Sequence, residues 1–448
     1  MKPSNLKSWL LGASAAASLA ALPAAADDHP GWREAFDGKG EYGYLSTWFV
    51  GNHKIAGDDG VVGSKYFKEA ILGTQKLPLE LIQAGLDVPD KAKSLYSTAC
   101  LGNWSCKFVT PSFEMLVLRR DPAHKAIIEG FFAKDSNWQQ AGYSWRGFLI
   151  RMVGWYNDKS LAPLVVKMAT FEPDSEYTND ALTAAASLLG TWNDKSLIEP
   201  CQAAFEVERN DARAIEPARQ ACAWYLTRMG DKVVAGKLKR ARMGSDYVAT
   251  LAAAAMGNTD AKADWQKAAK EFAGSPDRTD HAVALVALAL SGDGKAEKQV
   301  VGLLGGKNPD AAWEHATLLA NYADTPVGKR VLAAVKNAVY ALPIKEKAGR
   351  VQAVVAAHLA RMGDAGAVPA IKKLFASDDE SVREYLARTL ATGTAGVVLK
   401  LPGNGLAGGA PVAGLVAVLQ EAFGNEENKA IRANIARAWA MAAPAGGS

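Results

Sequence analysis

Carboxylates recur along this chain at positions that could supply metal ligands or acid–base groups. The positions, all aspartate except for one asparagine, are Asp121, Asp158, Asp194, Asp231, Asn258, Asp293, Asp324 and Asp364. Each follows an apolar stretch of helical periodicity, where a new helix needs an N-cap side chain to accept hydrogen bonds from its free N–H groups. Neighbouring repeats would hold these side chains about 10 Å apart, too far for two of them to share a metal ion. We therefore predict a row of helix N-caps and no metal site.

The four cysteines are predicted to form two disulfides. Helices expected over about 195–207 and 215–229 form an antiparallel hairpin, and its loop is centred between Cys201 and Cys222, so these two residues stand level with each other. Cys100 and Cys106 remain as the second, local pair. Export to an oxidising compartment would favour both bridges. The alternative is a pair of buried free thiols that behave as small apolar side chains.

No catalytic or cofactor-binding residue is predicted. No two histidines are spaced by four residues, as zinc-binding helices require, and we expect most of them to be packed or surface residues. The six are His29, His53, His124, His281, His315 and His358. The sequence also contains no haem-attachment motif, phosphate-binding loop, nucleophile elbow or dinucleotide fingerprint.

One basic stretch could serve as a docking patch. Its five cations are Lys232, Lys237, Lys239, Arg240 and Arg242. The simpler interpretation is a solvated helix face, because lysine stems cover apolar surface while their ammonium groups stay in water. The alternative is a contact site for an acidic partner, an anionic glycan or a lipid head group, and salt sensitivity of binding would separate the two.

The first residues are typical of a secretory signal peptide over 1–26. Lys2 and Lys7 precede a short apolar run, and small residues, Ala24–Ala26, precede Asp27. Removing this segment reduces the formal net charge from +4 to +2, so charge gives no indication of a nucleic-acid partner. No later apolar run is long enough to span a membrane. We expect a periplasmic or secreted protein.

The region that follows, 27–110, differs from the rest of the chain. It is rich in glycine and aromatic residues, among them Trp32, Tyr44 and Trp48, and it lacks the repeat pattern. We interpret it as an N-terminal cap that covers the apolar end of a stack, since terminal repeats must do this. An aromatic ligand platform is the alternative.

From 111 to 443 the chain repeats a two-helix unit, seen best over 358–390. Apolar residues lie at helical spacing, and Gly363 followed by Asp364 predicts a tight turn between two helices. Such a pair cannot close a core alone and must stack on copies of itself. A Gly-rich insertion at 392–411 interrupts the last units and is a candidate contact loop, and 444–448 is a frayed tail.

Two helices near the C-terminus carry similar residues at the same relative positions. They are Asp379, Val382, Arg383, Leu386, Ala387 and Leu390, and again Asn428, Ile431, Arg432, Ile435, Ala436 and Trp439. Both sets resemble the first helix of a HEAT repeat. The resemblance implies an all-α fold, a right-handed α-solenoid of HEAT-like hairpins with an atypical N-terminal cap. It also implies that the chain binds other proteins, as HEAT-repeat proteins commonly do, and it implies no shared catalytic residue.

The leading hypothesis is therefore an exported scaffold or adaptor that binds a protein partner in the bacterial cell envelope, with no nucleic acid and no cofactor. The alternative is an enzyme or enzyme subunit, of the HEAT-like lyase type, with a site near the N-terminal aromatic region. A purely structural envelope component is a third possibility. The sequence leaves a small-molecule ligand open.

Overall fold

The computed structural model describes residues 109–139, 145–171, 176–206, 212–231, 247–393 and 412–443, together with Leu79, Gln83, Leu86 and Leu406. These residues form eighteen α-helices and three short 3-10 helices, and no β-strand occurs among them. The prediction of an all-α chain is confirmed for this part. The signal peptide predicted at 1–26, most of the cap at 27–110, most of the insertion at 392–411 and the tail at 444–448 lie outside the described residues.

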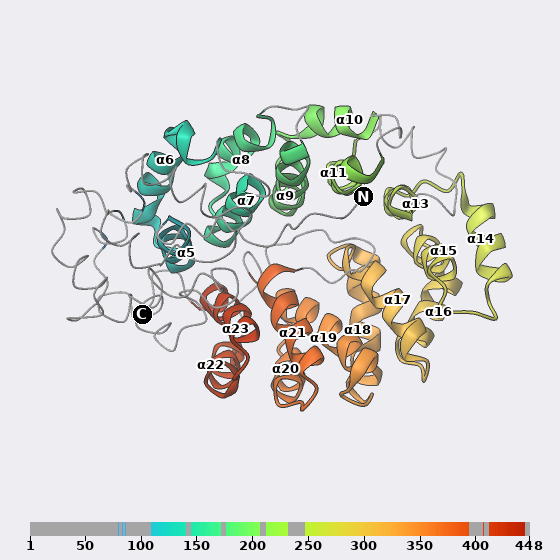
Figure 1. Cartoon of the computed structure of the whole chain (residues 1–448). Helices are drawn as coiled ribbons and strands as arrows, with labels where there is room; N and C mark the ends of the chain where they lie inside the picture. Colours follow the sequence, from blue (N-terminus) through green and yellow to red (C-terminus); the bar gives the residue numbers. More distant parts are fainter. Residues whose placement is uncertain are drawn as a thin grey trace, which may run out of the picture.

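The helices form two layers (Figure 1). The inner layer consists of helices that contact one another in chain order: α5 (Val109–Arg119), α7 (Trp145–Tyr156), α9 (Glu176–Trp192), α11 (Ala212–Arg228), α13 (Tyr247–Ala255), α15 (Thr279–Leu290), α17 (Pro309–Ala320), α19 (Glu346–Arg361), α21 (Glu380–Thr392) and α23 (Lys429–Ala442). The outer layer covers it with α6 (Lys125–Ala133), α8 (Ala162–Ala169), α10 (Ile198–Glu206), α14 (Lys262–Glu271), α16 (Gly294–Leu304), α18 (Pro326–Tyr340), α20 (Ala367–Phe375) and α22 (Leu415–Asn425). Three short helices, η4 (Pro122–His124), η5 (Asp135–Asn137) and η6 (Lys159–Leu161), lie in the connections.

Burial separates the two layers. In α15, ten of twelve residues are buried, whereas in α14 two of ten are buried. The same contrast holds between α17, with nine of twelve residues buried, and α18, with five of fifteen. An inner helix has neighbours on both sides and an outer helix over it, so it is apolar almost all round, while an outer helix needs one apolar stripe.

Most turns from inner to outer helices contain a residue in the left-handed backbone conformation. The residue before the aspartate or asparagine of the predicted row has a positive φ at seven turns: Arg120, Asn157, Asn193, Gly230, Gly257, Gly292 and Gly363. At Gly363, φ is 88°, and the N–H groups of Gly363 and Asp364 donate to the carbonyls of Ala360 and Leu359. A left-handed residue followed by an N-cap ends one helix and starts the next within a few residues. The turn predicted at Gly363 and Asp364 is found.

The two helices that resemble HEAT repeats, α21 and α23, use their matching residues in the same way. Asp379 and Asn428 cap the two N-termini, each accepting a backbone N–H at 3.0 Å. Each arginine donates to the backbone carbonyl six residues earlier, Arg383 to Ser377 at 2.8 Å and Arg432 to Glu426 at 3.5 Å. Arg383 also donates to the carboxylate of Glu426 at 2.8 Å. Both arginines therefore fasten their helices to Glu426, which lies between α22 and α23.

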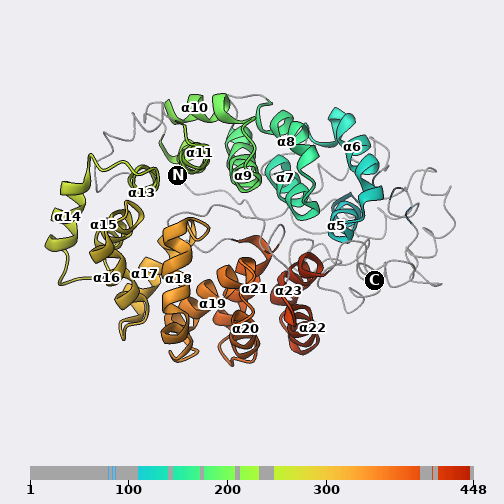
Figure 2. The same cartoon turned by 180° about the vertical axis from the view of Figure 1, so that it is seen from behind.

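The inner layer closes on itself, and Figure 2 shows α23 beside α5. Arg437 donates to the carboxylate of Glu114 at 2.8 Å, and its guanidinium carbon lies 5.5 Å from the ring centroid of Trp155. Arg120 donates to the carbonyl of Met441 at 2.8 Å. Helices α5 and α23 are thus joined by polar contacts. This closure was not predicted from the sequence, which assigned the covering of the exposed end to residues 27–110.

The Gly-rich insertion is described at Leu406. This side chain is 7% exposed, and its N–H donates to the carbonyl of Leu390 at 3.0 Å. The insertion therefore returns to α21 at this point.

Substitution Glu114→Gln is expected to weaken the closure. The Glu114 and Arg437 side chains are 6% and 16% exposed, so the change leaves a nearly buried guanidinium without a carboxylate, at a cost of about 3 kcal/mol. Denaturant unfolding measures this loss. The matched control is Glu421→Gln, whose ion pair with Lys372 is more than half exposed and should change stability by less than about 1 kcal/mol. Equal losses in the two variants would contradict a structural role for the closure.

Candidate functional site

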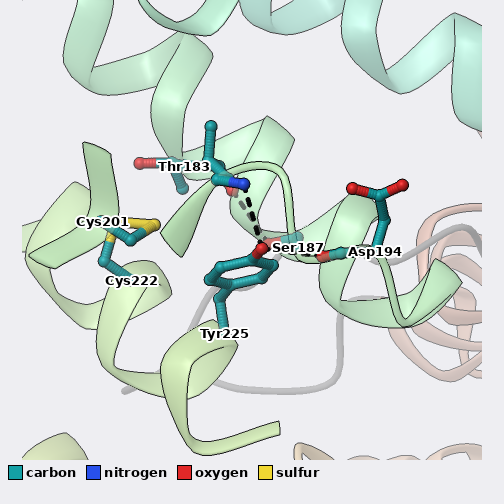
Figure 3. Close-up of a disulfide and its surroundings, with 7 residues drawn as sticks. Thr183, Ser187, Asp194, Cys201, Cys222 and Tyr225 are labelled. Atoms are coloured by element: carbon teal, nitrogen blue, oxygen red, sulfur yellow. Dashed lines mark hydrogen bonds between the residues drawn. A yellow bond between two sulfur atoms is a disulfide. The ribbon is translucent and has the colours of Figure 1, made fainter. Parts of the chain in front are cut away.

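Cys201 and Cys222 form the predicted disulfide between α10 and α11 (Figure 3). Their Cα atoms are 4.8 Å apart, and both side chains are fully buried. Beside the bridge, the hydroxyl of Tyr225 donates to the carbonyl of Asp194 at 2.7 Å and accepts the N–H of Leu197 at 3.1 Å. The start of α10 is therefore tied to α11 by a covalent bond and by a buried tyrosine.

The register that predicted this pair differs from the observed one. Cys201 lies five residues before the end of α10, whereas Cys222 lies ten residues after the start of α11, so the two cysteines are not equidistant from the helix ends. Because a helix rises 1.5 Å per residue, α11 begins about 7 Å beyond the end of α10. The pairing was predicted correctly, and the symmetric hairpin was not.

We expect non-reduced peptide mapping to recover Cys201 joined to Cys222. The bridge closes a loop with a sequence separation of 21, and its reduction should cost about 3 kcal/mol through the entropy of the unfolded chain. Thermal unfolding with and without reductant measures the difference, with the Cys201→Ala, Cys222→Ala double variant as the control that reductant should not affect. Recovery of a free Cys201, or of Cys201 joined to Cys100 or Cys106, would contradict the pairing.

Three of the predicted N-caps are found, since Asp121 caps η4, Asp158 caps η6 and Asp293 caps α16. A backbone N–H two residues later donates to the side chain at 2.8 to 3.1 Å in Asp121, Asp158, Asp194, Asn258, Asp293 and Asp364. Asp231 lies at the end of a described stretch and accepts a hydrogen bond from Gln202 at 2.8 Å. The N-caps of α14 and α20 are Ala261 and Gly366, so the predicted caps at Asn258 and Asp364 are wrong, and these two side chains instead accept N–H groups within the turn before the helix.

Asp324 departs from the row. Helix α18 is capped by Thr325, whose hydroxyl accepts the N–H of Gly328 at 3.1 Å. Asp324 instead pairs with Arg228 at the end of α11, with 2.5 Å between Nη2 and Oδ2. Helix α11 and the turn between α17 and α18 belong to opposite halves of the ring (Figure 1). The prediction that Asp324 is an N-cap is wrong, because the neighbouring threonine performs that role.

Arg228 is held by its own helix and by α9 as well. Its Nε donates to the carbonyl of Gly190 at 3.1 Å, and its guanidinium carbon lies 4.8 Å from the ring centroid of Trp224. Trp224 in turn donates from Nε1 to the carbonyl of Asn321 at 2.9 Å, across the ring. A Cβ at Gly190 would lie 2.4 Å from the Trp224 ring, so the glycine permits this close approach. Two polar contacts therefore join the halves of the inner layer here.

A third charge, Arg361 at the end of α19, interacts electrostatically with this pair. Burial lowers the pKa of the Arg361 guanidinium, and the carboxylate of Asp324 opposes that effect. Burial would raise the pKa of Asp324, but the hydrogen bond from Arg228 and the charges of both arginines bring it below its ordinary value. Two guanidinium groups against one carboxylate leave an excess positive charge. Such an arrangement can bind a carboxylate or another small anion.

Three histidines lie in consecutive inner helices. His281, His315 and His358 are at most 6% exposed, and the first two rings are in edge contact with centroids 5.7 Å apart. Burial lowers the pKa of His315 and of His358 to about 4, so both are neutral at pH 7. Their interpretation as packed residues is confirmed. His358 lies one turn before Arg361, and its Nε2 is buried without a hydrogen-bond partner.

Two aspartate substitutions distinguish a turn aspartate from the bridge. Asp364→Ala removes the acceptor of the Gly366 N–H and of the Lys336 ammonium group and should cost about 1 kcal/mol. Asp324→Ala leaves Arg228 without its carboxylate and should cost roughly 1 to 2 kcal/mol, less than a fully buried pair, because the Asp324 side chain is 46% exposed.

A double-mutant cycle measured by denaturant unfolding tests the assignment. Arg228→Gln should remove most of the effect of Asp324→Ala and leave that of Asp364→Ala unchanged. If the loss of unfolding free energy caused by Arg228→Gln is additive with the losses caused by both aspartate substitutions, the bridge between α11 and the α17–α18 turn does not contribute to stability.

Several predicted site residues lie outside the described residues. They are Cys100, Cys106, Lys232, Lys237, Lys239, Arg240, Arg242 and the aromatic residues at 32–48. The second disulfide, the basic patch and the N-terminal ligand platform remain predictions.

Sequence reasoning missed the Arg228–Asp324 bridge, although a local signal exists. Asp324 follows Ala323, whereas seven other members of the row follow a residue with positive φ. Because the side chains of the row are alike, the sequence predicts the same role for all of them. The different residue before Asp324 indicates that its turn differs from the others.

No family model, curated protein or solved structure matches this chain. Among the described residues, no group of three or more histidine, cysteine or acidic side chains is placed to hold a metal ion. The described helices also include none with the length and hydropathy of a membrane span.

Proposed function

We propose that this chain is an exported HEAT-like α-solenoid that acts as a scaffold or adaptor and binds a protein partner in the bacterial cell envelope. Its stacked helix pairs, and the shared roles of Asp379, Arg383, Asn428 and Arg432, support the HEAT-like assignment. The signal-like segment at 1–26 and the disulfide between Cys201 and Cys222 support export, since disulfides persist in oxidising compartments.

The main support for the proposal is that polar contacts hold the inner layer together. Glu114 and Arg437 join its two ends, and Arg228 and Asp324 join its two halves. A helical scaffold fixed at these points presents a preformed surface, which reduces the entropy cost of binding. Stacked helix pairs present extended surfaces of the kind that protein partners use.

Purified mature protein, used as bait in envelope extract of the source bacterium, tests this function. We expect one envelope protein to be retained, to be identified by mass spectrometry, and to bind again as a purified component in calorimetry. The matched control is the Glu114→Gln bait, in which the closure is weakened. Failure of any purified candidate to bind the wild-type chain, or recovery of the chain in the cytosol with residues 1–26 uncleaved, would contradict the proposal.

A further inference from the structure

The two helical layers differ in their basic residues. The inner helices contain twelve arginines and two lysines, whereas the outer helices contain one arginine and eleven lysines. The inner arginines are Arg119, Arg146, Arg151, Arg213, Arg219, Arg228, Arg350, Arg361, Arg383, Arg388, Arg432 and Arg437; the outer one is Arg330. The net charge of the chain does not reveal this difference between the layers, because arginine and lysine each count as one positive charge.

Most inner arginines have a structural task. Arg146 donates to the carbonyl of Phe171 at 2.6 Å, Arg228 to that of Gly190 at 3.1 Å, and Arg437 to the carboxylate of Glu114 at 2.8 Å. A planar guanidinium with several donors is suited to such half-buried positions, whereas an ammonium group keeps its water and suits the outer surface.

Arg350 and Arg361, both on α19, are different. Neither makes a hydrogen bond or ion pair with any residue that the structure describes. Both side chains are of intermediate exposure, and Nε of Arg350 is buried without a hydrogen-bond partner. They are eleven residues apart, which is close to three helical turns, so they share one face of α19 about 16 Å apart along its axis. Arg361 interacts electrostatically with Arg228 and Asp324, which places this face toward the other half of the ring.

The other charges near this face are largely paired. Lys347, one turn before Arg350, pairs with Asp310, and Asp324 pairs with Arg228. Arg388 lies over the ring of Tyr385, with 5.0 Å between the guanidinium carbon and the centroid, and Arg350 also influences Tyr385 electrostatically. Arg350 and Arg361 therefore add two positive charges to this face that form no ion pair with a described carboxylate.

We propose that the face of α19 carrying Arg350 and Arg361 binds an extended acidic segment of a protein partner. In an extended chain, side chains four residues apart point to the same side and lie about 13 Å apart. Flexible arginine side chains about 16 Å apart can each reach one of two such carboxylates and bind it in a bidentate manner. The inference rests on the proposed binding function and names the chemistry of the partner.

Fluorescence anisotropy tests this with a labelled Gly/Ser peptide that carries two glutamates four residues apart. We expect saturable binding that weakens as salt rises, because the contacts are ionic. Arg361→Gln and Arg350→Gln should each weaken binding about 10-fold, as expected for the loss of one charge-assisted contact. The peptide with both glutamates replaced by glutamine should bind at least as weakly.

The matched control is Arg330→Gln, which removes the outer-layer arginine paired with Glu297 and should leave peptide affinity unchanged. Circular dichroism and thermal unfolding establish that each variant is folded. Equal binding by the wild type and both α19 variants would overturn the inference, as would tighter binding of a single-stranded oligonucleotide than of the acidic peptide.

Partner capture separates this inference from the broader function. If the wild-type chain and the Arg350→Gln, Arg361→Gln double variant bind the purified envelope partner equally, the α19 site is wrong and the scaffold function stands. If the wild-type chain binds the acidic peptide but no envelope protein, the scaffold function fails and the site remains.

Discussion

The structure depends on the burial of inner helices on every side. In α15 and α17 the run of buried residues is nearly continuous, so each helix needs a neighbour on both flanks and a cover from the outer layer. In an open stack the first and last inner helices would lack a neighbour on one flank. Here α5 and α23 supply it for each other, through Arg437 on Glu114 and Arg120 on Met441. The closure therefore depends on polar contacts between the two ends.

The same constraint explains the choice of basic residues. A cation on an inner helix has little access to bulk water, so it must reach a carbonyl, a carboxylate or an aromatic face. Arginine does this with a rigid fork of donors, and lysine does it less well. The outer helices face water, where lysine stems can lie over apolar surface. Arg350 and Arg361 are informative because they lie on an inner helix without such partners among the described residues.

The predictable part of the fold is local. Helical periodicity and the Gly363–Asp364 turn predict pairs of helices joined by short turns, since both are determined within a few residues. The disulfide was predictable because Cys201 and Cys222 lie on neighbouring helices of a chain expected to be exported. The register of these two helices was not predictable, because α11 begins about 7 Å beyond the end of α10. The ring closure joins partners 323 residues apart and depends on the summed curvature of many pairs, which no local pattern reports.

Asp324 is the member of the aspartate row that pairs across the ring. Six members accept a backbone N–H group two residues later, at the start of the next helix or in the turn before it. Asp324 has the same side chain, but Thr325 takes over its helix, so its carboxylate is released for Arg228 on the opposite half. Once Asp324 has paired with Arg228, Arg361 has no carboxylate of its own among the described residues. The positive charge left on α19 is therefore a consequence of one shifted cap.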